Sequence, residues 1–470
     1  MSKCKMILPK VWIAAIPKYW NASIPTDHPV SSSEFSLKFE TPEVQSAVKT
    51  MEENINTENS IITEDMLPEN TVVGSYLGTY DVTGEPGVET LLSPEKVPAN
   101  AVGVLVMHLN SESNEWEKVE DAHIKDGYVY GTLESFSPIA VFVIKRDTFL
   151  AEAGVYGKYP TFVANGVSVK VTLNENGEIV ALDGNGKETI IPENGEIIGG
   201  TVDGSDIEST SIYVGPGVKL YRILGGSLCA DHSVTIDKVS INVDGIEIAS
   251  NGLYGGSFGT RVNEVIINAK NSKLAYVGAG RSNQNDGTIK GDNEAENLGF
   301  ASKGWVKNAT LNLDNCEIGV AYCACASGNS YDDHTEVNIT NSKVEYFITG
   351  GSNGRTRECI VKAENCEFDN YQATNRGIVH YAKSILKNCT CPAFFVFGHT
   401  DKDVTGDIEK VYYDITGGSY KLHLGKIADV PVTEHDVAAE HIDVLKISRS
   451  TELEFVDNTD KILGDILRIK

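Results

Sequence analysis

The sequence of 470 residues has few prolines, no long apolar run and fewer basic than acidic residues. Its 15 prolines accompany 44 glycines, and glycine without proline is typical of tight turns between β-strands rather than of disorder. No stretch approaches the roughly 18 apolar residues of a membrane-spanning helix, so we expect no membrane partner. The 40 basic residues stand against 66 acidic ones, and a formal net charge of −26 disfavours nucleic acid as a partner.

The nine cysteines are an odd number and lack the spacing of a small secreted disulfide framework. Folding in a reducing cytosol is the simpler interpretation. The chain starts with basic and apolar residues, but Pro9, Lys10 and Pro17 interrupt the apolar run before it reaches signal-peptide length. We therefore expect a soluble protein that folds inside a cell and carries no export signal.

Common catalytic motifs are also missing. The sequence contains no Gly-x-Ser-x-Gly elbow, no phosphate-binding loop and no His-Glu-x-x-His. Asp332, Asp333 and His334 follow Tyr331 on an expected turn, but acid–base catalysis needs carboxylates at a defined separation. Surface turns of an acidic protein carry carboxylates by default. The sequence thus favours a non-enzymatic protein with no catalytic residues, no cofactor and no metal.

Residues 1–65 are interpreted as an N-terminal arm followed by a short helix. Thr41 is the expected N-cap, and Pro42 suits the first helical position. The apolar face of this helix comprises Val44, Val48, Met51 and Ile55. An arm with aromatic residues and no sustained period suits an anchor that docks on another protein.

From Thr71 to Ile144 the hydrophobic period changes to two, and turn residues separate short β-rich runs. This pattern predicts a small antiparallel β-sandwich over residues 66–147. Within it stand Trp116 and Glu117, and then Ser135, Phe136, Ser137, Pro138, Ile139 and Ala140. At these residues the segment resembles an Ig-like domain of gut-bacterial surface proteins and of particle proteins of crAss-like and related gut phages. The resemblance implies an Ig-like spacer and brings no catalytic residues with it.

Residues 148–195 are expected to form a connector and a hairpin about the turn Asn174-Glu175-Asn176-Gly177. The open end of a β-helix exposes unpaired backbone, so we interpret the hairpin as the cap of the following domain.

One short phrase recurs nine times from residue 197 onward: apolar residues, a Gly or Asn turn, a small residue and another apolar residue. The turn residues are Gly199, Gly225, Gly245, Asn271, Asn315, Asn341, Asn365, Asn388 and Gly417. Gly and Asn most readily adopt the left-handed conformation of a sharp corner. Their spacing and the alternating strands around them predict an all-β chain in which residues 196–425 form a right-handed parallel β-helix of the pectin-lyase type.

The gap of 44 residues between Asn271 and Asn315 holds an ordinary coil and a polar insertion that returns at Trp305. Insertions of this kind collect on one face of a solenoid, often the binding face.

Cys316, Cys366 and Cys389 occupy one position of the repeat. Because Cys-x-Cys is not the usual zinc spacing, we predict an interior ladder of reduced thiols.

The repeat region also resembles the Gly-rich β-helix modules of gut-phage fibres and gut-bacterial surface proteins. The resemblance implies a head-fibre, decoration or tail-fibre component of a virion, folded in the host cytoplasm. It further implies contacts with other virion proteins through the N-terminal arm, a homo-oligomer with a trimer as the expected form, and contact with host surface polysaccharide. A bacterial cell-surface adhesin and a tailspike-type polysaccharide depolymerase are the alternatives.

Candidate glycan contacts are aromatic and acidic side chains near the insertion and the wide turns, since aromatic rings stack on sugars. They are Trp305, Tyr331, Asp332, Asp333 and Tyr371. The alternative is that the aromatic side chains seal the coil. Residues 426–470 keep an apolar alternation, which suits either a terminal cap or an oligomer contact.

Overall fold

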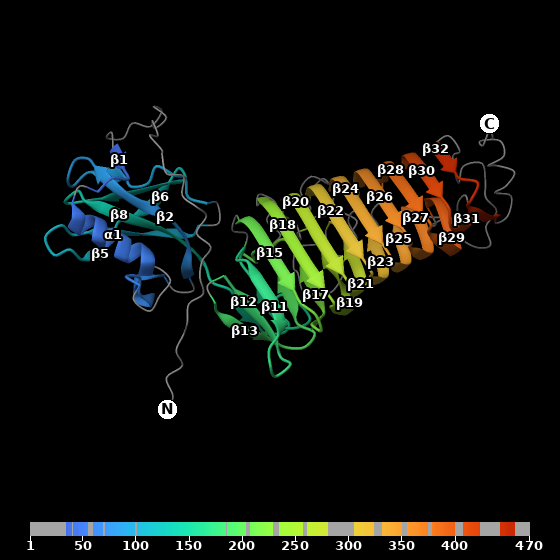
Figure 1. Ribbon diagram of the computed structural model, residues 1–470, viewed down its shortest axis with the longest axis horizontal. Coiled ribbons are helices and arrows are strands. Elements are labelled where there is room, and N and C mark those ends of the chain that lie inside the picture. The colour runs from blue at the N-terminus through green and yellow to red at the C-terminus, as the bar shows by residue number, and fades with distance from the viewer. Residues whose placement is uncertain are drawn as a thin grey trace. The chain divides into compact units, whose positions relative to one another are not determined.

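The structure is a computed structural model, and it describes fifteen stretches of the chain. They are residues 34–39, 41–54, 60–68, 71–98, 101–184, 186–203, 207–228, 235–256, 261–280, 305–323, 331–349, 355–374, 378–399, 408–423 and 442–455. The chain divides into two compact units, residues 1–147 with 182–187, and residues 148–181 with 188–470 (Figure 1). Residues 1–33, which are most of the predicted arm, and the polar insertion (residues 281–304) lie outside the described residues.

The N-terminal unit contains two antiparallel sheets, with strand orders β1-β2-β8-β4-β5 and β3-β7-β6. Their strands are β1 (Glu34–Ser36), β2 (Thr71–Thr83), β3 (Glu89–Leu91), β4 (Gly103–Leu109), β5 (Trp116–Lys118), β6 (His123–Lys125), β7 (Tyr128–Thr132) and β8 (Pro138–Arg146). Val106 and Val141 of the five-stranded sheet share one buried cluster with Val129 of the three-stranded sheet. The predicted sandwich is confirmed, and its Ig-like identity stays a prediction.

A helix, α1 (Pro42–Asn54), covers the other face of the five-stranded sheet. Thr41 is its N-cap, because its Oγ1 accepts a hydrogen bond from the Val44 amide at 3.3 Å. Met51 is buried in a cluster with Phe142 of β8, to which Met66 of the short 3₁₀ turn η1 (Glu64–Met66) also contributes. The sequence predicts a helix that belongs to a separate anchor, whereas this helix packs on the sandwich.

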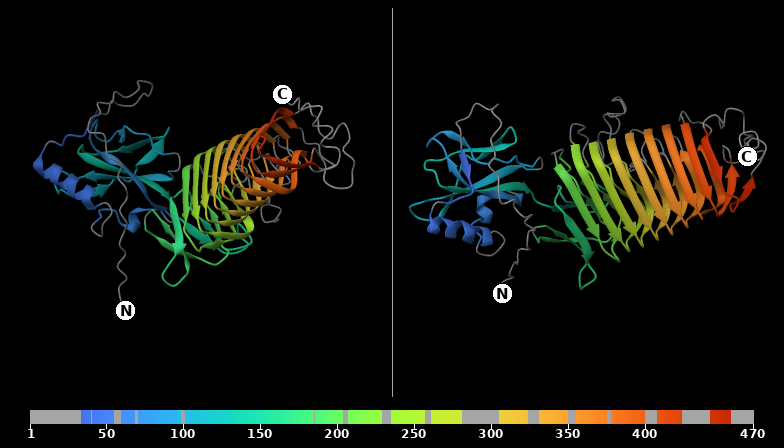
Figure 2. Two further views of the ribbon diagram at one scale, coloured as in Figure 1. Left: turned by 45° about the vertical axis from the view of Figure 1, so that its right-hand side comes forward. Right: turned by 45° about the horizontal axis from the view of Figure 1, so that its top comes forward.

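The C-terminal unit is a parallel β-solenoid built from two sheets that face each other across one core (Figure 2). The twelve-stranded sheet contains β13 (Glu188–Ile191), β12 (Ile179–Asp183), β11 (Val169–Leu173), β15 (Ile207–Val214), β18 (Thr235–Asp244), β20 (Arg261–Lys270), β22 (Trp305–Asp314), β24 (Tyr331–Thr340), β26 (Arg355–Glu364), β28 (Ile378–Lys387), β30 (Ile408–Thr416) and β32 (Ile442–Ile447), in that order. From β15 to β32 every neighbouring pair is parallel.

The thirteen-stranded sheet receives the second strand of each coil. Its strands are β9 (Phe149–Ala151), β10 (Thr161–Val163), β14 (Glu196–Ile198), β16 (Lys219–Leu220), β17 (Arg222–Leu224), β19 (Glu247–Tyr254), β21 (Lys273–Gly278), β23 (Glu317–Tyr322), β25 (Lys343–Ile348), β27 (Glu367–Thr374), β29 (Thr390–His399), β31 (Ser419–His423) and β33 (Glu452–Phe455). The predicted parallel β-helix is confirmed. Parallel pairing extends beyond the expected bounds, since β10 pairs with β14 and β31 with β33.

The expected hairpin at the start of the solenoid is present as β11 and β12. The Asn174 amide donates to the Glu178 carbonyl at 2.9 Å and closes its turn. β11 pairs in parallel with β15, and β12 occupies the side of β11 away from β15. The hairpin therefore covers backbone groups of β11 that would otherwise lie at the edge of the sheet.

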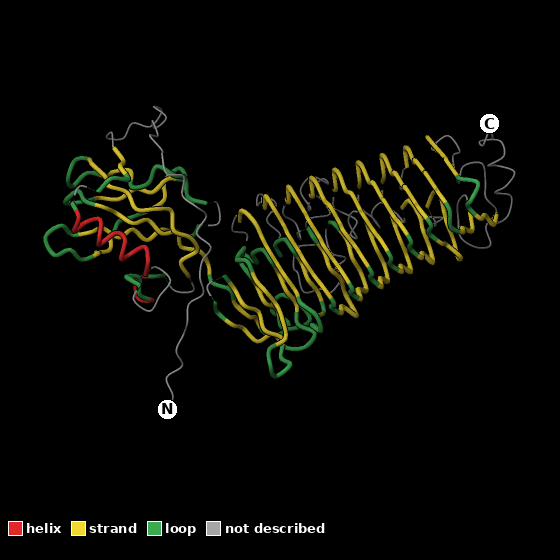
Figure 3. The backbone as a smooth tube through the Cα atoms, viewed as in Figure 1, coloured by secondary structure: helices red, strands yellow, loops and turns green. Residues whose placement is uncertain are grey.

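Sharp corners join the strands of the twelve-stranded sheet to those of the thirteen-stranded sheet (Figure 3). Seven of the nine predicted corner residues have the left-handed backbone that the corner requires: Gly245, Asn271, Asn315, Asn341, Asn365, Asn388 and Gly417. Gly199 and Gly225 do not. They follow β14 and β17, where their amides donate to the Leu224 and Tyr254 carbonyls of the next coil. The prediction for these two was wrong, because a Gly-Gly pair also suits close packing of successive coils.

The position after each of the five corner asparagines is a column of Ser and Cys. The Ser342 hydroxyl accepts a hydrogen bond from the Cys316 amide at 3.0 Å and donates one to the Thr340 carbonyl at 2.7 Å. The Cys316 thiol donates to the Asp314 carbonyl at 3.4 Å in the same manner. At the asparagine corners a small side chain with a polar atom thus hydrogen-bonds the backbone of the corner, and either residue type can do so.

All the described cysteines are buried and none of them forms a disulfide, and burial raises the pKa of the Cys316 thiol. The predicted interior position of Cys316, Cys366 and Cys389 is confirmed. The other described cysteines are Cys323, Cys359 and Cys391, whereas Cys4, Cys229 and Cys325 lie outside the described residues.

Candidate functional site

The outer face of the twelve-stranded sheet carries a row of four asparagines on successive coils. Asn242, Asn268, Asn312 and Asn338 stand in direct register on β18, β20, β22 and β24. Each amide Nδ2 donates to the Oδ1 of the asparagine on the preceding coil, at 2.8 Å from Asn268, 2.8 Å from Asn312 and 3.0 Å from Asn338. We call this row the amide ladder.

Strand geometry explains why the amide ladder forms. Side chains alternate between the two faces of a strand, and the buried neighbours Ile267 and Ala269 direct Asn268 outward. Strands lie about 4.8 Å apart, which suits stacked amides. An amide has two N–H donors and an oxygen with two acceptor positions. Because the ladder uses one donor and one acceptor of Asn268 and of Asn312, half of their hydrogen-bonding capacity is left for a ligand.

A shallow groove of about 410 Å³ runs beside the amide ladder. Lys270, Asp314 and Thr340 line it together with the four asparagines and Leu313. Asp314 Oδ1 accepts hydrogen bonds from Thr340 Oγ1 at 2.7 Å and from Asn341 Nδ2 at 3.0 Å, and these bonds hold the pKa of Asp314 below its usual value. The groove therefore offers amides, a carboxylate and an ammonium group, which suit the hydroxyl groups of a sugar.

Two of the five predicted glycan contacts begin strands of this same sheet, and a third, Asp333, lies two residues into one of these strands. Trp305 starts β22 and Tyr331 starts β24, and the two are partners in the register. Their side chains lie outside the described residues. Asp333 is partly exposed and forms an ion pair with Arg357 of the next coil at 3.0 Å. The sequence places Asp333 on a turn, whereas the residue belongs to β24.

Tyr371 and Asp332 correct the prediction, because both side chains are fully buried. The Tyr371 ring stacks on Phe347 at 5.1 Å, its hydroxyl lies 2.6 Å from Ser384 Oγ, and burial raises its pKa. Asp332 lies in a register column between Val306 and Thr356. Neither side chain is accessible to a glycan. β24 begins before the expected turn ends and β27 continues into the expected turn, so both residues belong to strands and face inward.

The amide ladder was not predicted, although the sequence carries a signal for it. Each ladder asparagine precedes a corner residue by three positions in four consecutive coils, as Asn268 precedes Asn271. The corner asparagines alone do not predict this second column. An asparagine that recurs at a fixed offset from a corner must stack with its equivalents in a parallel solenoid.

Other outward carboxylates on this face are paired with basic side chains of a neighbouring coil. Glu336 lies 2.7 Å from Lys362, and Glu358 lies 2.7 Å from His334. The hydrogen bond from Lys362 lowers the pKa of Glu336. A general acid requires the opposite shift at neutral pH, so this arrangement suits structure and recognition more than proton transfer.

Comparison with protein-family models, with curated proteins and with solved structures found no match to this chain. Within the described ranges, no helix is long and apolar enough to cross a membrane. The same ranges contain no group of three or more His, Cys, Asp or Glu residues arranged to hold a metal ion. A parallel β-solenoid fits a fibre or tailspike-like protein that projects from a surface.

Proposed function

We propose that the chain is a non-enzymatic fibre-type or decoration protein of a phage particle. The observation that supports this most is the unbroken parallel pairing from Thr161 in β10 to Phe455 in β33. Each coil contacts only its neighbours, so rigidity accumulates with the number of coils. The core of one continuous apolar cluster from Phe162 to Leu422 supports the same role.

Immunogold electron microscopy of purified phage particles tests this proposal. Antibodies raised against the solenoid should label a fixed position on the particle, and detection of the full chain by mass spectrometry should accompany the label. Label on the walls of uninfected bacteria, with none on particles, would instead establish the adhesin alternative.

We also propose that the groove beside the amide ladder binds surface polysaccharide of the host. Asn268→Ala removes one amide of the ladder and should weaken binding of the full-length chain to host polysaccharide by about tenfold, the value of one or two hydrogen bonds. Asn263→Ala is the matched control, since Asn263 lies on the same strand and bonds Asp237 outside the groove. Equal affinity of both variants and the parent chain would remove the groove from the proposal.

A depolymerase remains the alternative from another class. Incubating the chain with the same polysaccharide should release no new reducing ends or unsaturated products. Products that appear with the parent chain and disappear with Asp333→Asn would replace the structural role by an enzymatic one.

A further inference from the structure

A second row of outward side chains alternates in charge along the corner edge of the thirteen-stranded sheet. On successive coils it contains Lys219, Glu247, Lys273, Glu317, Lys343 and Glu367, each in register with the next. We call this row the charge ladder. It lies on the side of the corners opposite the amide ladder, at the start of the strands β16, β19, β21, β23, β25 and β27.

Ion pairs within the chain engage the charge ladder only weakly. The Nζ–Oε distances are 3.3 Å for Lys219–Glu247, 3.8 Å for Lys273–Glu317 and 2.7 Å for Lys343–Glu367. These side chains are between 38% and 72% exposed. Exposed ion pairs of this kind contribute little to the stability of the fold. Because the side chains are exposed, the six charges are also accessible to a partner.

We propose that the charge ladder is the contact through which two copies of the chain pair with their solenoid axes antiparallel. Read in reverse, the order Lys-Glu-Lys-Glu-Lys-Glu becomes Glu-Lys-Glu-Lys-Glu-Lys. A twofold axis between the coils of Lys273 and Glu317 therefore sets an opposite charge against every member. Such an interface is isologous, with one patch used by both copies.

Parallel pairing about the same edge has the opposite result. Each lysine would meet the same lysine of the second copy and each glutamate the same glutamate, and like charges across an interface are repulsive. A trimer with parallel axes, as the fibre analogy implies, must therefore use other faces of the solenoid.

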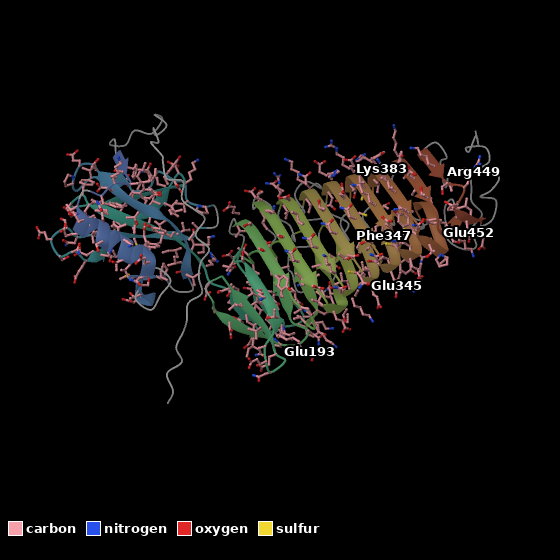
Figure 4. The ribbon with its side chains drawn as sticks, viewed as in Figure 1. Glu193, Glu345, Phe347, Lys383, Arg449 and Glu452 are labelled. Carbon is pink, nitrogen blue, oxygen red and sulfur yellow. The ribbon has the colours of Figure 1, made fainter. Side chains whose placement is uncertain are left out.

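The surface on either side of the charge ladder suits a second copy. A groove of about 610 Å³ borders the ladder from Lys219 to Lys343 and has room for side chains of a partner. On the other side, Tyr346 is 46% exposed and stands in register with Val320. Figure 4 labels Glu345, which points away from the solenoid beside this tyrosine.

The antiparallel arrangement also matches large side chains with small ones. Tyr276 stands one coil before Val320, and Gly252 one coil before Tyr276. The same twofold axis places Tyr276 opposite Val320 of the second copy and Tyr346 opposite its Gly252. Apolar contact beside a row of opposite charges is the usual composition of a protein interface.

Two charge-swap variants of identical composition test this arrangement in the full-length chain. Lys273→Glu/Glu317→Lys keeps opposite charges at all six contacts across the twofold axis, although it places like charges on neighbouring coils of one chain. Lys343→Glu/Glu367→Lys makes four of the six contacts between copies repulsive. Within one chain it places fewer like charges on neighbouring coils than the first variant does. Only the second variant should lose self-association, by about tenfold or more.

Analytical ultracentrifugation at low and high salt measures this outcome, and the parent dimer should weaken as salt rises. A zero-length carbodiimide cross-link between Lys219 and Glu367 reports the orientation. The two residues are five coils, or roughly 24 Å, apart in one chain and adjacent only across an antiparallel pair.

A monomeric parent chain, equal association of both variants, or absence of this cross-link would each overturn the proposal. Loss of thermal stability in the first variant, with no change in association of the second, would limit the ladder to intrachain pairing.

Discussion

The N-terminal unit and the solenoid use β-strands in opposite ways. The N-terminal unit pairs its strands antiparallel and builds each part of its core once, from dissimilar residues such as Phe142 and Met51. The solenoid pairs its strands in parallel and repeats side-chain positions on successive coils, as in the amide ladder. The first arrangement depends on particular partners, and the second on the repetition of a column.

This difference has a consequence for stability. The core of the N-terminal unit has no repeated positions and is expected to unfold cooperatively, because its sheets and helix depend on one another's side chains. In a solenoid each coil contacts mainly its neighbours, so the stability is close to a sum of local terms. The two units should therefore respond to comparable substitutions over different distances.

The largest effect is expected from Phe142→Ala in the N-terminal unit. Phe142 is fully buried, and its ring lies 5.2 Å from that of Tyr76. Truncation of a buried Phe costs about 3–5 kcal/mol. Differential scanning calorimetry should show the transition of the N-terminal unit at a much lower temperature, with the transition of the solenoid unchanged.

Leu311→Ala, at a fully buried position of β22, is the matched substitution in the solenoid. Hydrogen exchange should increase in β20 and β24, which pair with β22, and stay unchanged in β30. A uniform rise over all coils, or a shared shift of both calorimetric transitions, would contradict the proposed difference between the units.

An intermediate effect is expected from Ser342→Ala in the Ser/Cys column. The substitution leaves the Cys316 amide without the hydroxyl that accepts its hydrogen bond, at a cost of about 1–3 kcal/mol. Ser342→Cys should be nearly neutral, because cysteine occupies the same position on neighbouring coils. Chemical denaturation followed by hydrogen exchange measures both, and equal destabilisation by the two variants would show that the thiol cannot replace the hydroxyl.

The sequence allows prediction of whatever repeats or depends on local chemistry. Corner asparagines such as Asn341 can be predicted because few residue types adopt the left-handed backbone conformation. The N-cap Thr41 can be predicted because capping requires a short side chain that accepts a hydrogen bond. In both cases the physical cause lies within a few residues of the chain.

The direction of a side chain near a strand end is harder to predict, because a shift of one residue turns the side chain to the other face. Tyr371 and Asp332 were predicted on turns, but strands β27 and β24 include them and direct both side chains into the core. The amide ladder depends on contacts between residues 26 or 44 positions apart in sequence. Such contacts become visible only when the coils are correctly aligned.

The smallest effect concerns pH and the N-terminal unit alone. Burial lowers the pKa of His108, while the carboxylate of Glu117 partly opposes the shift, and His108 Nε2 lies 2.8 Å from Ser137 Oγ. The folded chain therefore binds this proton less readily than the unfolded chain does. Stability from the neutral imidazole is complete above the unfolded pKa of about 6.5 and decreases as pH falls below it. The melting temperature of the N-terminal unit should thus decrease from pH 8 to pH 5.5 relative to that of the solenoid. His108→Gln should make the two units respond alike, and an unchanged difference would assign the effect to another group.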